Sequence, residues 1–293
     1  MAVTAGLVED RPHFGISLML CAWLMFSVVD TSAKWMALLG FPAFQLAFMR
    51  YAGHFVISFG VIARGGLTRD RLHTGHAGQV VTRALLLITA TVSNFYALNF
   101  LPLTVISAIM FSSPVIVCFL SQHFLNEKIG PWRWFAILLG FVGVLIVIRP
   151  LGAAFHWAML LALFNALSLA LYSIMTRKLA GIVATETMQF YMGALGTTLL
   201  LPLAIWSWQA PADPLQWALL IGLGVFGWGG HQLLTNAHRF GSANTLMPFT
   251  YSFMIYLTIM GYLVFDHLPD QWTVLGALII VISGLIIWKR EQR

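Results

Sequence analysis

Charged side chains are scarce in this sequence. Asp, Glu, Lys and Arg make up 9% of its 293 residues, whereas 59% are apolar and the mean hydropathy is +0.85. An ordinary soluble domain is about 25% charged, so this composition excludes that class and indicates a polytopic membrane protein. The net charge of +6 does not indicate nucleic-acid binding, because most Lys and Arg residues lie at the ends of apolar runs, as membrane topology requires. We expect no nucleic-acid partner.

Cysteines and catalytic motifs are also scarce. Cys21 and Cys118 both lie inside apolar runs, so we expect buried, reduced thiols and no disulfide. No Cys/His cluster has zinc spacing, and neither H-E-x-x-H nor G-x-S-x-G occurs. The glycine-rich stretch Gly222–Gly230 lacks the Lys and the strand of a phosphate loop, which favours close helix packing or a flexible gate. We expect no metal, no cofactor and no enzyme activity.

Long apolar runs are what the sequence does contain. From Ala84 to Glu127 only His123 near the end and Glu127 itself can titrate, and this is too long for one crossing of roughly 20 residues. Phe100–Leu103 contains a proline, which favours a hinge between two crossings. A related aromatic turn, Asn236–Ser242, opens a second long run that closes on Asp266. This recurrence indicates an internal duplication.

The hydropathy pattern predicts an all-α integral membrane protein with ten transmembrane helices. Five spans in each half place the second copy upside down, which predicts two inverted five-helix repeats, 1–149 and 150–293, around a central cavity. The predicted spans are about Phe14–Leu39, Pro42–Ala63, Val80–Phe100, Leu103–Phe124, Trp132–Ile148, Phe155–Thr176, Thr185–Trp208, Leu215–Ala237, Ser242–Phe265 and Gln271–Trp288.

The distribution of Lys and Arg predicts the orientation. Thirteen basic residues, Arg83 among them, fall on the side of the N-terminus, and only Arg149 falls on the other side. Positive charge marks cytoplasmic loops, so we expect a multi-pass inner-membrane protein with both termini in the cytoplasm.

Several local patterns resemble EamA modules of the drug/metabolite transporter superfamily. They are the turn Ser112-Ser113-Pro114, the acidic stop Leu125-Asn126-Glu127, a repeated small-residue run and a glycine-marked last span. In the second module Asp266 stands where Glu is usual, and Pro248 comes earlier than Pro114 does. Within this superfamily the chain looks most like the YddG-type exporters of aromatic and other neutral amino acids.

The resemblance implies an exporter of such amino acids with broad specificity that works by alternating access in the lipid bilayer. A carrier of the same fold for S-adenosylmethionine, a nucleotide sugar or a cationic drug is the alternative. An intramembrane enzyme and a non-transporting receptor or assembly subunit are the rival classes. The sequence leaves the oligomeric state open, with a monomer among the options.

Intramembrane charges are the first candidates for the substrate site, because a charge in hydrocarbon usually faces a cavity or a partner. Asp30 and Lys34 lie one turn apart in the first span, and Arg50 lies at a similar depth in the second. One interpretation is a structural ion network between the two spans. A second is that they contact the charged groups of a zwitterionic substrate. Proton coupling through Asp30 is a third.

Uncharged polar and aromatic residues complete the predicted site. Buried amides need partners in lipid, so each one lines a cavity or joins two helices. By the repeat, the polar positions of span three correspond to those of span eight. The candidates are Asn94, Tyr96, Asn99, His231, Gln232 and Asn236, with Trp23, Tyr172 and Tyr251 as aromatic walls. Pro114 and Pro248 are the predicted hinges of spans four and nine.

Overall fold

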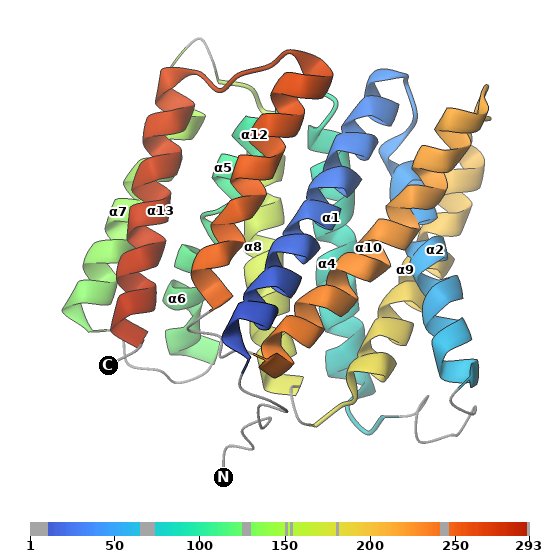
Figure 1. The fold of residues 1–293 in the computed structure, drawn as a ribbon, viewed down its shortest axis with the longest axis horizontal. Coiled ribbons are helices and arrows are strands. Elements are labelled where there is room, and N and C mark those ends of the chain that lie inside the picture. The colour runs from blue at the N-terminus through green and yellow to red at the C-terminus, as the bar shows by residue number, and fades with distance from the viewer. Residues whose placement is uncertain are drawn as a thin grey trace.

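The computed structural model describes residues 11–64, 74–124, 130–149, 152, 155–179, 182–240 and 246–291. In these residues every regular element is a helix (Figure 1). The elements are α1 (Pro12–Leu38), α2 (Ala43–Arg64), α4 (Ala77–Ala97), α5 (Leu103–Met110), α6 (Ser113–Phe124), α7 (Pro131–Ile148), α8 (Ala158–Leu179), α9 (Thr185–Trp206), α10 (Pro214–Phe240), the 3₁₀ helix η1 (Met247–Tyr251), α12 (Ser252–Phe265) and α13 (Gln271–Glu291).

These helices coincide with the ten predicted spans, which confirms the all-α membrane fold. Eight stretches of the described chain are long and apolar enough to cross a bilayer, and shorter apolar helices cover Trp134–Ile148 and Phe249–Phe265. Large apolar side chains such as Leu138 and Leu263 are exposed on the outside of the bundle. A bilayer would cover such a surface, because lipid tails are as apolar as these side chains.

Two of the spans contain a proline near the start of a helix. Span four is divided into α5 and α6 at Phe111 and Ser112, and Pro114 is the second residue of α6. The described part of span nine contains η1, which includes Pro248 and leads directly into α12. Proline is tolerated in the first turn of a helix because its missing N–H has no partner there, so neither proline breaks the middle of a helix.

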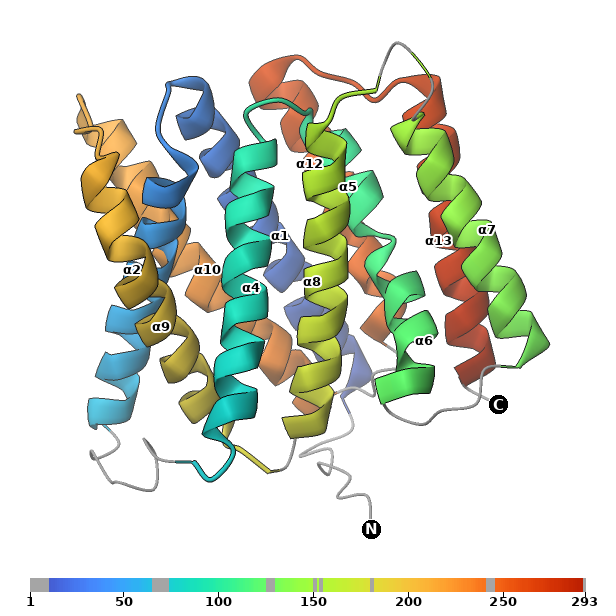
Figure 2. The same cartoon turned by 180° about the vertical axis from the view of Figure 1, so that it is seen from behind.

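The contacts between helices of the two halves come in equivalent pairs. If each helix is exchanged for its repeat equivalent, the contact of α1 with α10 becomes that of α8 with α4, and α2 with α10 becomes α9 with α4. The pairs α2 with α9 and α7 with α13 map onto themselves. The halves are thus interlocked inverted repeats (Figures 1 and 2). α1 begins and α13 ends on one face, hereafter the terminal face; the other is the opposite face.

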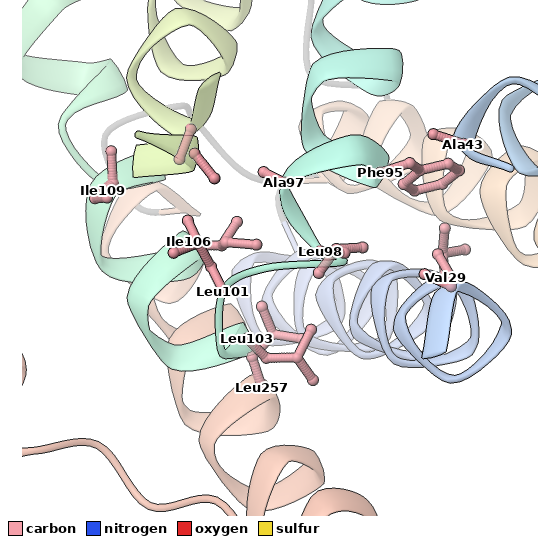
Figure 3. Packing of buried hydrophobic residues seen from close by; sticks show 14 of the residues in the cluster. Val29, Ala43, Phe95, Ala97, Leu98, Leu101, Leu103, Ile106, Ile109 and Leu257 are labelled. Atoms are coloured by element: carbon pink, nitrogen blue, oxygen red, sulfur yellow. The ribbon is translucent and has the colours of Figure 1, made fainter. Parts of the chain in front are cut away.

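The apolar core lies where the two halves meet. Figure 3 shows Phe95, Leu98 and Ile106 from the α4–α5 corner gathered against Val29 of α1 and Leu257 of α12. This corner is also where Pro102, with extended backbone, begins α5. The packing fixes the position of α4, the helix whose polar side chains form much of the site.

Close contact between backbones brings α10 against α2. A Cβ added to Gly53 would lie 2.8 Å from the Cα of Gly224, so neither position has room for a side chain. This agrees with the close-packing interpretation of Gly222–Gly230. Neither Cys21 nor Cys118 forms a disulfide in the described part of the chain, but only Cys118 is buried. The expectation for Cys21 was wrong, since that residue lies on the exposed side of α1.

Candidate substrate site

The three predicted intramembrane charges do not form ion pairs with one another. The Asp30 carboxylate, on a residue 7% exposed, accepts hydrogen bonds of 3.2 and 3.3 Å from the Asn94 amide. Arg50 Nη1 donates to Thr91 Oγ1 at 3.0 Å. Lys34 Nζ donates to the carbonyl oxygens of Leu98 and Leu101 at 2.8 and 2.9 Å. Each charge therefore contacts α4 or the turn that follows it.

The hydrogen bonds continue into the second half of the chain. Asn165 of α8 donates its amide to Asn94 Oδ1 at 3.2 Å. Nearer the terminal face, Arg83 donates to the hydroxyl groups of Tyr172 and Thr176. Arg83 and Asn94 lie about 16 Å apart along α4, at roughly 1.5 Å per residue. Polar contacts between the halves thus extend over about half of a hydrocarbon core of roughly 30 Å.

Two histidines join the same region from α2 and α10. His54 lies one turn after Arg50, and its ring centroid is 5.9 Å from that of His231. The His231 ring is 5.0 Å from Phe26, which in turn lies 5.6 Å from Trp23. Phe26 is one turn before Asp30, so the contacts form a closed ring over α1, α4, α2 and α10. We call the polar members of this ring and its neighbours the central polar cluster: Trp23, Asp30, Arg50, His54, Thr91, Asn94, Asn165 and His231.

Several buried polar atoms of this region have no hydrogen-bond partner. They are Trp23 Nε1, Ser58 Oγ, Arg83 Nη1, His231 Nε2 and Ser252 Oγ. Each such atom costs about 1–3 kcal/mol when buried, and native structures contain few of them. Atoms of this kind on facing helices of both halves indicate a place for a polar ligand or ordered water.

Five of the predicted site residues are therefore brought together: Trp23, Asp30, Arg50, Asn94 and His231. Tyr172 lies half-buried beneath Arg83, whose guanidinium is 4.4 Å from its ring centroid. Gln232 and Asn236 are half-buried on α10. Lys34 contacts backbone carbonyls at the end of α4, where the negative end of the helix dipole favours a cation.

The structure places three other predicted residues away from the cluster. Tyr96 is 45% exposed and stacks with Phe100 and Trp157 on the outside. Asn99 donates its amide to carbonyl oxygens of its own helix. Tyr251 packs 5.2 Å from the ring of Phe111. The sequence pattern identifies the polar residues of a helix but does not show which face of that helix packs against the other half.

His54, Thr91 and Asn165 lie in the central polar cluster, and Arg83 joins the two halves nearer the terminal face, but none of the four is among the candidates expected from the sequence. Asn165 is the one amide in its apolar span, and a lone amide in a membrane helix needs a partner, so a signal was present. His54 was visible as the residue one turn after Arg50. Arg83 was counted as a charge at the cytoplasmic end, but it is 3% exposed inside α4.

The sequence matches a family model twice, over residues 13–149 and 156–289, and the model describes the EamA-like transporter family. The chain belongs to this family. It is therefore a membrane transporter of the drug/metabolite transporter superfamily and not an enzyme. A solved crystal structure with 16% identity superposes with a TM-score of 0.62 and covers 93% of this chain and 99% of that chain, which supports the fold alone.

Similar proteins of known name carry several different metabolites. A riboflavin transporter of Vibrio cholerae is 31% identical over 98% of this chain and 96% of its own length. An S-adenosylmethionine uptake transporter of Rickettsia bellii is 30% identical over 92% and 94%. The pseudopaline exporter CntI of Pseudomonas aeruginosa is 26% identical over 98% and 100%. These names favour the alternative of another metabolite over the expected export of aromatic amino acids.

Proposed function

We propose that this protein carries a flat heteroaromatic metabolite of the riboflavin type and binds it at the central polar cluster. The observation that supports the proposal is the presence, on helices of both halves, of buried polar atoms without a hydrogen-bond partner, Trp23 Nε1 and His231 Nε2 among them. The similarity to a riboflavin transporter over nearly the whole chain supports the choice of cargo.

The chemistry of the cluster suits a ligand that is rich in hydrogen-bond acceptors. Trp23 Nε1–H is a free donor, and Arg50 has further N–H groups beyond the one that Thr91 accepts. The isoalloxazine ring offers carbonyl oxygens and ring nitrogens as acceptors. Phe26 and Phe253, at 5.6 and 5.3 Å from Trp23, provide aromatic surface for such a ring, since ligand pockets combine apolar walls with few polar groups.

Movement of the ligand follows from the inverted halves. A site between two inverted repeats opens to one side and then to the other as the repeats rock against each other. Pro114 and Pro248 lie in the first turns of α6 and η1, in equivalent spans, and we propose that they act as the hinges. Both termini lie in the cytoplasm in this proposal, so the opposite face is the outer face of the inner membrane.

S-adenosylmethionine is the second candidate cargo, favoured by one observation. Among the described residues Asp30 has no basic partner within ion-pair distance, and its hydrogen-bond partner is an amide. A carboxylate that no cationic side chain contacts directly suits a cationic ligand, because it favours a nearby opposite charge. The relatives' names include both uptake and export, so the direction is part of the test.

Counterflow in proteoliposomes tests the proposal. Liposomes loaded with unlabelled substrate should take up labelled riboflavin faster than empty liposomes, with little exchange of phenylalanine. Asp30→Asn should leave most riboflavin exchange intact and abolish exchange of S-adenosylmethionine if that is the cargo. Exchange of phenylalanine alone would reject the proposal and restore the amino-acid expectation.

A further inference from the structure

At the opposite face, the described parts of the two halves are joined by an ion pair and by a buried glutamine. The ion pair connects the end of α7 to the start of α13, with Arg149 Nη2 2.6 Å from Asp270 Oδ2. These side chains are 27% and 46% exposed, so water competes with the pair and it holds the two ends together only weakly. The glutamine connects α2 to the chain that follows α9.

Gln45, in the first turn of α2, bonds the backbone of Gln209 with both ends of its side-chain amide. Gln45 Nε2 donates to the Gln209 carbonyl oxygen at 2.8 Å, and Gln45 Oε1 accepts the Gln209 N–H at 2.9 Å. Gln45 is completely buried, whereas Gln209 lies beyond the end of α9 at the surface. One amide thus satisfies both backbone groups of a residue in the other half. We call this pair of hydrogen bonds the Gln45 latch.

α2 and α9 also touch near their middles, well away from the latch. A Cβ added to Gly193 of α9 would lie 2.8 Å from the Cα of Phe55 in α2, so the two backbones are in close contact there. Gln45 lies ten residues before Phe55, which is about 15 Å along α2 at roughly 1.5 Å per residue. A tilt of about 10° around this crossing would move the Gln45 end by about 2.5 Å, which is enough to break a hydrogen bond.

The position of the latch links it to the movement of the halves. α2 and α9 lie side by side at one end of the molecule (Figure 2), and their contact maps onto itself when the halves are exchanged. A carrier built from inverted repeats opens its site to one side at a time. When the ends of α2 and α9 separate, water at the surface can bind the freed amide and backbone groups. Opening therefore exchanges hydrogen bonds and leaves none unsatisfied.

We propose that the Gln45 latch holds the carrier closed at the opposite face and is released when the cargo site opens to that side. The inference uses the transporter fold and does not depend on which metabolite is carried. Only Gln45 contributes a side chain to the latch, because Gln209 contributes its backbone. The Gln209 side chain donates separately to the Leu39 carbonyl oxygen at 3.3 Å. Replacement of the two glutamines should therefore have different effects.

Double electron–electron resonance on the full-length protein in lipid nanodiscs tests the latch. Spin labels at Leu38→Cys and Trp206→Cys report the distance between the end of α1, next to α2, and the end of α9 at the opposite face. Both native side chains are exposed. Cys21→Ala and Cys118→Ala in the background restrict labelling to these two positions.

We expect Gln45→Met to raise the ratio of the long-distance to the short-distance population by about tenfold, because it keeps the length of the side chain but loses both hydrogen bonds. Gln45→Asn keeps an amide that is one methylene too short for both contacts, and should shift the ratio in the same direction. Gln209→Ala is the matched control. It keeps the backbone N–H and carbonyl oxygen of the latch, so its distances should match those of the wild type.

Melting curves of the same proteins separate a latch from a contact that only stabilises the fold. A lower melting temperature of Gln45→Met with an unchanged distance distribution would overturn the proposal. So would an equal shift in Gln209→Ala, or wild-type distances in both Gln45 variants. Riboflavin does not enter these measurements, so a failure of the proposed cargo in counterflow would leave the test of the latch intact.

Discussion

The two halves of this transporter share a scaffold but differ in the chemistry that they bring to the centre. The first half contributes the charges of Asp30, Arg50 and Arg83. The second half contributes neutral side chains, Asn165, which donates to Asn94, and Tyr172, which accepts from Arg83. Equivalent helix contacts occur in both halves, but the charged side chains of the first half have no charged equivalents in the second. In the proposed mechanism the backbone symmetry would allow the halves to rock, and the unsymmetrical set of side chains would bind a ligand whose two ends differ.

Removal of the charge on the first half should have the largest effect. Arg50→Ala should lower kcat/KM for riboflavin exchange by about 100-fold, since hydrogen bonds to charged groups contribute about 1.5–3 kcal/mol each. Proteoliposome counterflow measures this. Arg64→Ala, at the exposed end of the same helix, is the matched control, and an equal effect of the two variants would remove Arg50 from the site.

A neutral change on the second half should have a smaller effect. His231→Phe keeps a ring beside Phe26 but removes the nitrogen that has no partner. We expect the Kd of riboflavin to rise by about tenfold, which corresponds to roughly 1.4 kcal/mol, as measured by quenching of flavin fluorescence. His13→Phe is the control at an exposed position. Normal affinity in His231→Phe would mean that the second half contributes no polar contact.

The repeat-equivalent pair Asn94 and Gln232 sharpens the comparison further. Asn94→Ala should change the ratio of riboflavin to S-adenosylmethionine exchange, because it leaves Asp30 and Asn165 without their shared partner. Gln232→Ala should change the ratio less, since this half-buried residue lies beside the cluster. Exchange ratios equal to wild type in both variants would exclude both residues from the site.

Lys34 should affect stability more than transport. Lys34→Met removes two hydrogen bonds that hold the end of α4 to α1, so the melting temperature should fall by several degrees while the affinity for riboflavin is kept. Lys289→Met, at an exposed position near the end of α13, should melt like the wild type. Loss of riboflavin affinity in a Lys34→Met protein that melts normally would instead make Lys34 a substrate contact.

The ion pair at the opposite face should have the smallest effect. Partial burial alone would raise the pKa of Asp270, but the Thr273 side chain, the Thr273 N–H and the Arg149 guanidinium outweigh it and hold this pKa below its ordinary value. The ion pair is therefore fully stabilising above the ordinary Asp range and is lost only as pH falls through the lowered pKa. Asp270→Asn should cost about 0.2–1 kcal/mol at neutral pH, and melting curves at falling pH should converge for the two proteins.

The spans could be predicted from the sequence because bilayer thickness dictates the length of each apolar run. Asp30, Arg50 and Asn94 could be predicted as well, because polar groups in such runs are conspicuous. The hydrogen-bond partners of these residues could not be predicted, because packing sets the rotation of each helix about its axis. Tyr96 faces outward although Asn94, two residues earlier, is buried. Arg83 shows the same limit, because its place near a helix end concealed its contact with Tyr172.

The central claim is that both halves contribute polar contacts to a single ligand. A double-mutant cycle on the Kd of riboflavin, with Arg50→Ala in the first half and His231→Phe in the second, tests it most directly. We predict that each single variant weakens binding and that the two effects are not additive, because both groups contact one ligand in one cluster. Wild-type affinity in both single variants, or strict additivity of two independent losses, would contradict the account.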